Sequence, residues 1–261
     1  MAVVEVEQDG AVRWVWLNRP ERLNAINAEL GAALFRAVQD AAKDTAVRAV
    51  VLAGRGRAFC AGDDLAGTER PRSSVHAERR SDYLHAEGRW PEVAKVLVTM
   101  PKPVVAMLHG HAHGAGWDLA LSCDFRLADA DLQASHAYIR RGLASGVSRL
   151  PAFVGMGVAS DLLMRGARLT AQHAHELGLV TEVVKPGTLE ARTREFASEL
   201  AAAPTIALGL LKEALGQAYS PGHDHRMWLQ AGIAADALVT EDAAEGRVAF
   251  VQKREPTFQG R

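Results

Sequence analysis

The sequence predicts an α/β fold that continues into a helical C-terminal region. Over the first two-thirds of the 261 residues, β-branched apolar runs alternate with segments whose apolar residues recur at helical spacing. This alternation is typical of parallel strands joined by helices. After Gly155 the pattern becomes mostly helical. Two glycine-rich turns, each directly after a predicted strand, interrupt the first part of the chain.

The first two-thirds of the chain supply the predicted strands. An Asp9-Gly10 turn precedes the first of them. Alternating or β-branched apolar runs predict strands at 11–17, 47–52, 104–108 and 124–127. Helical spacing predicts helices at 28–42, 81–100 and 115–122. Pro91 is expected to break or kink the second of these helices. The polar stretch from Gly67 to Ser74, interrupted by Pro71, is expected to be a loop.

The last third is expected to contain helices and one short strand. Thr170 can cap a short helix that Gly178 ends. A strand is predicted at 180–184, followed by helices at 189–202, 204–218, 225–239 and 242–252. Pro204 suits the first position of its helix.

Composition excludes several classes of function. Lys+Arg is 30 and Asp+Glu is 31, so the net charge of −1 offers no basic surplus for nucleic acid. No apolar run is long enough to cross a bilayer, so no membrane partner is expected. The segment Met1–Glu7 does not resemble a signal peptide, and we expect a cytoplasmic protein. Cys60 and Cys123 do not make a disulfide framework and are predicted to be buried free thiols.

The two glycine-rich turns carry the chemical signal. They read Arg57-Ala-Phe-Cys-Ala-Gly-Asp-Asp-Leu65 and Gly110-His-Ala-His-Gly-Ala-Gly-Trp-Asp118. A sharp turn into a helix leaves backbone N–H groups unpaired, with the positive end of the helix dipole behind them. If the two turns converge, their N–H groups form an oxyanion hole for a carbonyl that becomes an enolate or a tetrahedral anion.

Motifs along almost the whole chain resemble those of the crotonase family, also called the enoyl-CoA hydratase/isomerase superfamily. Besides the two turns, the resemblance includes Leu17-Asn-Arg-Pro20 with Asn24-Ala25, and Lys102-Pro-Val-Val-Ala106. It continues through Cys123-Asp124, Ala174-x-x-x-Gly-Leu-Val180 and the C-terminal segment from Glu245 to Phe258. Each motif alone is a modest signal, whereas all of them in this order are highly specific.

The resemblance implies a crotonase-like spiral of ββα units, with a core at 1–200 and a helical trimerisation region at 201–261. It also implies homotrimers, often paired into hexamers, and an acyl-CoA substrate. The thioester carbonyl would bind the N–H groups of Ala61 and Ala115. No cofactor or metal is implied, because CoA is part of the substrate. Residues expected to bind the substrate are Arg22, Leu23, Ala25, Gly62, Asp63, Asp64, Leu65, His111, Gly114 and Trp117.

The chain departs from the family at the two positions where a hydratase holds its water between glutamates. Asp118 occupies the first position and Tyr138 the second. Hydration needs a base for the water and an acid for the α-carbon. Asp118, in the first turn of a helix, can be ionised and is the expected general acid/base. Tyr138 can donate a proton, but its ordinary pKa of about 10 makes it a poor base.

These substitutions leave the reaction open. The alternatives are hydration, isomerisation, decarboxylation or C–C hydrolysis of an acyl-CoA. A homologue that binds acyl-CoA without turnover, or one that opens a non-CoA diketone, also fits the residues.

Histidines near the second turn are further candidates. His111 and His113 could act as a base close to the site, and His136 shares a face with Tyr138 if that segment is extended. His109, His111 and His113 alternate, but no carboxylate or cysteine at ligand spacing accompanies them. No metal site is therefore predicted.

Overall fold

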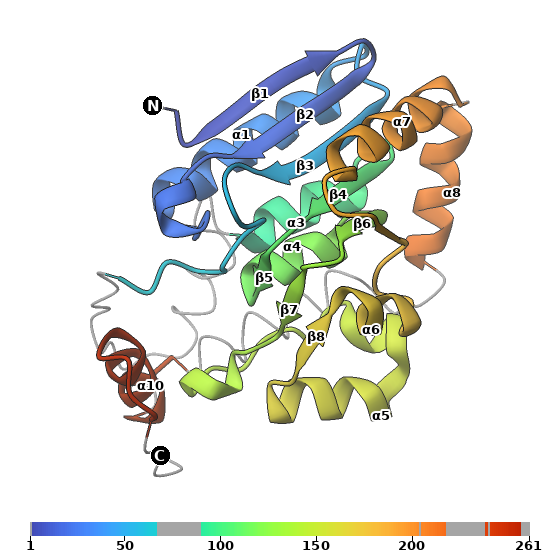
Figure 1. The fold of residues 1–261 in the computed structure, drawn as a ribbon. Coiled ribbons are helices and arrows are strands. Elements are labelled where there is room, and N and C mark those ends of the chain that lie inside the picture. The colour runs from blue at the N-terminus through green and yellow to red at the C-terminus, as the bar shows by residue number, and fades with distance from the viewer. Residues whose placement is uncertain (1, 67–89, 204, 218–237, 240, 257–261) are drawn as a thin grey trace.

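The computed structural model describes residues 2–66, 90–203, 205–217, 238–239 and 241–256. Two sheets make up its β structure (Figure 1). The larger sheet has the strand order β1-β2-β3-β4-β6-β9, and the smaller has the order β5-β7-β8. The strands of the larger sheet are β1 (Val4–Asp9), β2 (Val12–Leu17), β3 (Ala49–Gly54), β4 (Val104–Leu108), β6 (Phe125–Asp129) and β9 (Glu182–Val184). Those of the smaller sheet are β5 (His111–His113), β7 (Gln133–Ser135) and β8 (Arg168–Thr170).

The larger sheet is parallel from β2 to β9, and only β1 pairs antiparallel, with β2. The chain passes directly from β4 to β5 and from β6 to β7, so a strand of the large sheet is followed by one of the small sheet. This is the α/β architecture that the sequence predicts.

Helices cover both faces of the large sheet (Figure 1). Those that cover the sheet are α1 (Ala28–Lys43), α3 (Trp90–Thr99) and α4 (Ala115–Ser122) on one face and α7 (Leu189–Ala202) on the other. The remaining helices are α5 (Leu150–Arg165), α6 (Ala171–Glu176), α8 (Thr205–Gln217) and α10 (Glu241–Val251), with the 3-10 turns η1 (Pro20–Arg22) and η2 (Ile139–Arg141).

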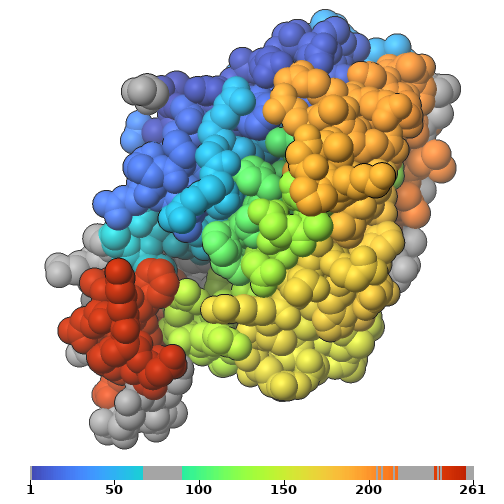
Figure 2. Space-filling model, in the orientation of Figure 1, coloured from blue at the N-terminus to red at the C-terminus, as the bar shows by residue number. Residues whose placement is uncertain are grey.

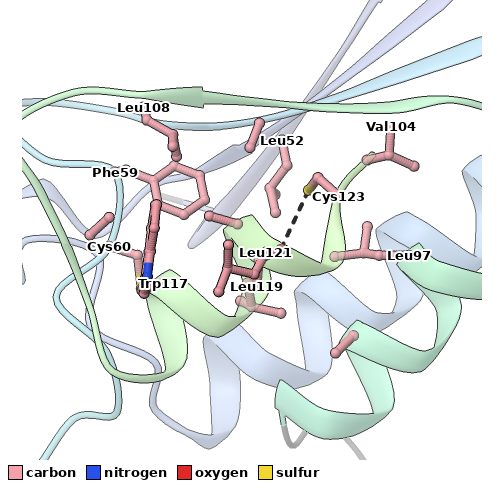
Figure 3. Packing of buried hydrophobic residues seen from close by; sticks show 14 of the residues in the cluster. Leu52, Phe59, Cys60, Leu97, Val104, Leu108, Trp117, Leu119, Leu121 and Cys123 are labelled. Atoms are coloured by element: carbon pink, nitrogen blue, oxygen red, sulfur yellow. Dashed lines mark hydrogen bonds between the residues drawn. The ribbon is translucent and has the colours of Figure 1, made fainter. Parts of the chain in front are cut away.

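The alternation within β2 explains how the sheet buries both faces. Val15 and Leu17 join the cluster under α1, α3 and α4, whereas Trp14 and Trp16 join the cluster under α7. Figure 3 shows the first cluster, in which aromatic and leucine side chains from β3, β4 and α4 meet. Helix α4 is buried along its whole length at the centre of the molecule, and this fixes the second glycine turn, from which it starts.

The predicted elements agree with the structure to within about two residues at most ends. The exceptions are helix α5, the two 3-10 turns, β1 and the three strands of the small sheet, which were not predicted. The strands of the small sheet are three residues long, too short for a period of two to be recognised. Pro91, expected to break or kink a helix at 81–100, lies in the first described turn of α3, a position where proline is tolerated. The predicted loop at 67–74, residues 81–89 and most of the predicted helix at 225–239 lie outside the described residues.

Both cysteines are free and buried, as expected. Burial raises the pKa of the Cys60 and Cys123 thiols to about 12, so both remain protonated and unreactive at neutral pH. Among the described residues, no helix is long and apolar enough to span a membrane.

Candidate active site

The two glycine turns converge, as the sequence predicts. The Cys60 N–H donates to the His111 carbonyl at 2.9 Å, and the His113 N–H donates to the Cys60 carbonyl at 3.0 Å. These bonds pair the first turn with β5, the strand that leads into α4. Both turns therefore present their backbone at the same place.

Ala115 is the first residue of α4, after Gly114 with φ 52° and ψ −124°. Within the part of the chain that the structure describes, the Ala115 N–H has no acceptor. Gly62 (φ 97°) lies beside it, and a Cβ there would fall 3.5 Å from the Ala115 nitrogen and 2.7 Å from the His113 carbonyl oxygen. The glycine keeps this space open, and the N–H at the helix N-terminus is available to an oxyanion.

The N–H of Ala61, the other expected oxyanion donor, is not free. It donates to the Leu23 carbonyl at 2.9 Å. A buried N–H without a partner is costly, so the turn satisfies it within the chain. A thioester oxygen that binds Ala61 must replace this carbonyl. Leu23 and the neighbouring Asn24 both have positive φ, 51° and 55°, which is unusual for residues with a side chain.

The contact between the turns is tight at Gly116. A Cβ at this position would lie 2.5 Å from the Cys60 carbonyl oxygen and 2.7 Å from its Cβ. Only glycine therefore lets α4 approach the first turn this closely.

Replacing Gly116 by alanine is expected to lower the free energy of unfolding by about 2 kcal/mol, because backbone must shift to relieve the overlap. The sign of the change in the free energy of unfolding is informative, because helix propensity alone would favour alanine by about 1 kcal/mol. Urea unfolding measures the change. Gly157→Ala in α5 is the matched control, because nothing lies within 4 Å of its added Cβ. A Gly116→Ala protein as stable as the control would contradict the tight packing.

Asp118, Tyr138 and His136 form one buried hydrogen-bonded cluster. The Tyr138 hydroxyl donates to Oδ2 of Asp118 at 2.6 Å, and Nε2 of His136 lies 3.1 Å from Oδ1. In the tautomer that carries its proton on Nε2, His136 donates this hydrogen bond to the Asp118 carboxyl oxygen. The three residues are 2%, 8% and 3% exposed. His136, a weak candidate on sequence grounds, therefore orients the aspartate.

A loop closes behind this cluster. Gly146 has φ 88°, and a Cβ there would lie 2.6 Å from Cδ2 of the His136 ring. The glycine lets the segment after η2 pack directly on His136, which holds the imidazole against Asp118.

A cavity of about 270 Å³ lies in front of the two turns. Of the residues predicted for the site, eight line it: Leu23, Ala61, Gly62, Asp63, Leu65, His111, Gly114 and Tyr138. His113, a possible base on sequence grounds, lines the cavity too. The lining residues not predicted are Ala137, Arg141, Leu143 and Phe250.

Six predicted residues do not line the cavity: Arg22, Ala25, Asp64, Ala115, Trp117 and Asp118. Ala115 can reach it only through its N–H. Asp118 lies behind Tyr138 and reaches it only through the tyrosine hydroxyl. Asp64 pairs with Arg19 at 3.0 Å. Trp117 is fully buried among Phe59 and Leu108 (Figure 3), so the prediction that it binds substrate is wrong and it belongs to the core.

The histidines of the second turn have separate environments. His113 Nδ1 lies 2.9 Å from the Ser135 hydroxyl, and burial, followed by the nearby His111 and Arg168, lowers the pKa of His113 to about 4. Its imidazole is therefore neutral at physiological pH and a weak base. His109 Nε2 instead contacts the Gly56 carbonyl at 2.9 Å. Among the described residues, no group of three or more His, Cys, Asp or Glu side chains could hold a metal ion.

Comparison with known proteins identifies the family. Residues 7–261 match the family model described as enoyl-CoA hydratase/isomerase. The chain belongs to this family. Two curated relatives are the 1,2-epoxyphenylacetyl-CoA isomerase of Escherichia coli (strain K12), 34% identical with 94% of each chain covered, and a putative enoyl-CoA hydratase of Thermus thermophilus, 36% identical with 98% of this chain and 100% of that protein covered.

Solved structures agree with this assignment. The crystal structure of an enoyl-CoA hydratase from Mycobacterium avium subsp. paratuberculosis K-10 superposes with a TM-score of 0.87 at 28% identity, covering 99% of each chain. This enoyl-CoA hydratase/isomerase family member is thus an acyl-CoA-processing enzyme with the crotonase fold.

Proposed function

We propose that this enzyme moves a proton at the α-carbon of an acyl-CoA thioester, as an isomerase does, and does not primarily add water. The observation that carries the proposal is the position of Tyr138, which lines the cavity while its hydroxyl is bonded to the buried Asp118. One acid/base unit therefore faces the reacting atoms. The relative named 1,2-epoxyphenylacetyl-CoA isomerase supports an isomerase reaction.

In the proposed reaction the tyrosine and the aspartate act together. Asp118 is the base and acts through Tyr138: the tyrosine proton passes to Oδ2 of Asp118 as the Tyr138 oxygen takes a proton from the α-carbon. The electron pair of the broken C–H bond moves onto the thioester oxygen, which the Ala115 N–H stabilises. The Ala61 N–H contributes once this oxygen has replaced the Leu23 carbonyl. The reverse transfer returns a proton to the α-carbon or, in a conjugated enolate, to the γ-carbon. His136 keeps the aspartate oriented throughout.

Hydration would need a second group, because one residue must activate the water while another protonates the α-carbon. Asp63, His111 and His113 also line the cavity, but Tyr138 and Asp118 form a hydrogen-bonded acid/base pair there. This single pair favours proton transfer over hydration. The proposed steps use CoA only as part of the substrate and require no separate cofactor.

The test compares two reactions of the purified enzyme. We expect kcat/KM for converting hex-3-enoyl-CoA into the conjugated 2-enoyl thioester to exceed kcat/KM for hydrating crotonyl-CoA, both followed by ultraviolet absorbance. Faster hydration of crotonyl-CoA would overturn the proposal. Binding of both thioesters without either reaction would favour a non-catalytic homologue, and hydrolysis of a free diketone would favour the third alternative.

We also propose that the enzyme assembles as a trimer or a pair of trimers. Helices α5 and α8 expose large apolar side chains, including Met156 at 72%, Met164 at 75% and Ile206 at 82%. Exposed apolar surface of this extent marks an interaction face. Ile206→Glu combined with Leu210→Glu is expected to convert the oligomer into monomers in analytical ultracentrifugation. A wild-type protein that sediments as a monomer would contradict the proposal.

A further inference from the structure

Arg141 places a positive charge in the catalytic cavity. It follows Tyr138 by three residues through the 3-10 turn η2, and this spacing puts both side chains on one face. Both residues line the cavity of about 270 Å³. Sequence alone does not single out this arginine, because nothing in its neighbourhood distinguishes it from the adjacent Arg140.

The charge of Arg141 is not neutralised within the described residues. Its Nη1 donates to the Ala137 carbonyl at 3.2 Å, and no carboxylate oxygen of the described residues lies within 4 Å of its guanidinium nitrogens. Asp63 also lines the cavity but forms no ion pair with Arg141. Burial, followed by the nearby Arg140 and Arg168, lowers the pKa of Arg141. Within the described part of the chain, this half-buried guanidinium among like charges has no anionic partner, and it can bind one.

The last described helix holds this side chain in place. The Arg141 guanidinium lies over the Phe250 ring of α10, with its Cζ 4.5 Å from the ring centroid. Gly246 of the same helix packs on the Arg141 backbone so closely that any Cβ would overlap it. Figure 2 shows α10 (red) lying against the η2 region. These contacts with α10 fix the position of Arg141 in the cavity wall.

We propose that Arg141 binds a carboxylate at the far end of the acyl chain, so that the substrate is a CoA monothioester of a short dicarboxylic acid. This inference rests on the proposed function, because it places the acyl chain beside Tyr138. Leu143, Phe250 and Ala137 supply apolar parts of the same cavity wall. The cavity is slightly smaller than the ~300 Å³ of the smallest typical ligand pockets, a size that suits a short acyl chain. The planar guanidinium matches a carboxylate through two parallel hydrogen bonds.

The test measures binding rather than turnover. Calorimetry compares glutaryl-CoA with pentanoyl-CoA, which have the same number of acyl carbons and differ in the terminal carboxylate. Wild-type enzyme is expected to bind glutaryl-CoA about 10- to 100-fold more tightly, the range for a hydrogen-bonded charged group. Arg141→Met should abolish this preference and leave the affinity for pentanoyl-CoA within a few-fold. Arg140→Met is the matched control and should keep the full preference, because Arg140 is exposed and bonds to the Gly166 carbonyl.

The outcomes separate the possible sources of the anion. Equal weakening of glutaryl-CoA, pentanoyl-CoA and free CoA by Arg141→Met would assign the arginine to a CoA phosphate and overturn the proposal. A wild-type protein without preference for glutaryl-CoA would also overturn it. If Arg141→Met fails to fold, Arg141→Lys keeps a charge but loses the planar fork, and a preference reduced but not lost supports the proposal. Because both thioesters are saturated, these results do not depend on whether the proposed isomerisation occurs.

Discussion

Replacing Tyr138 by phenylalanine is expected to lower kcat about 1000-fold, within the range for loss of a general acid/base. The variant keeps the ring that lines the cavity and removes only the hydroxyl that reaches Oδ2 of Asp118 at 2.6 Å. KM should change little, because the ring still fills its place. Steady-state kinetics with hex-3-enoyl-CoA measure both constants.

The partner variant Asp118→Asn should produce a similar loss, because an amide cannot receive the tyrosine proton. The double variant should be no slower than either single variant, since residues that act as one unit give non-additive losses. Thermal unfolding of each variant shows whether the fold is kept. Multiplied losses in the double variant would contradict the relay and place the two residues in separate steps.

Ala115→Pro is expected to lower kcat by about 100- to 1000-fold, the effect of removing one oxyanion donor. Proline lacks the N–H, and the first position of a helix tolerates it because that N–H has no helical partner. The preceding Gly114 has no side chain to clash with the proline ring. Stability should therefore be nearly unchanged while catalysis is lost.

Ala115→Gly is the control for this prediction. Glycine keeps the N–H and removes only the methyl group, so kcat should stay within a few-fold of the wild-type value. An Ala115→Pro enzyme that folds and retains its activity would show that this N–H does not stabilise the reaction.

The site could be predicted as far as local backbone determines it. Glycines at 62, 114 and 116 mark a positive φ or a close approach, and each is explained by the structure. The resemblance also identified Asp118 and Tyr138. That Tyr138 lines the cavity and Asp118 lies behind it could not be predicted, because this arrangement depends on tertiary packing around His136.

Long-range contacts account for most of what the sequence did not reveal. The bond from Ala61 N–H to Leu23 joins segments 38 positions apart, and no local pattern indicates it. The Arg141 guanidinium packs over Phe250, which belongs to a helix more than a hundred residues later in the chain, and no local pattern indicates this contact. Tertiary packing also decides the place of Trp117. Its position after the second glycine turn suggested a substrate contact, but α4, which contains it, is buried along its whole length.

The most direct test of the account is deuterium exchange at the α-carbon of butyryl-CoA and glutaryl-CoA in deuterated water, followed by mass spectrometry. Neither saturated thioester can be isomerised or hydrated, so incorporation reports only cleavage of the α C–H bond and formation of the enolate. We predict incorporation in at least one of them with wild-type enzyme and none above the buffer rate with Tyr138→Phe. Absence of incorporation in both, with enzyme that calorimetry shows to bind them, would contradict enolate formation by the Tyr138–Asp118 pair.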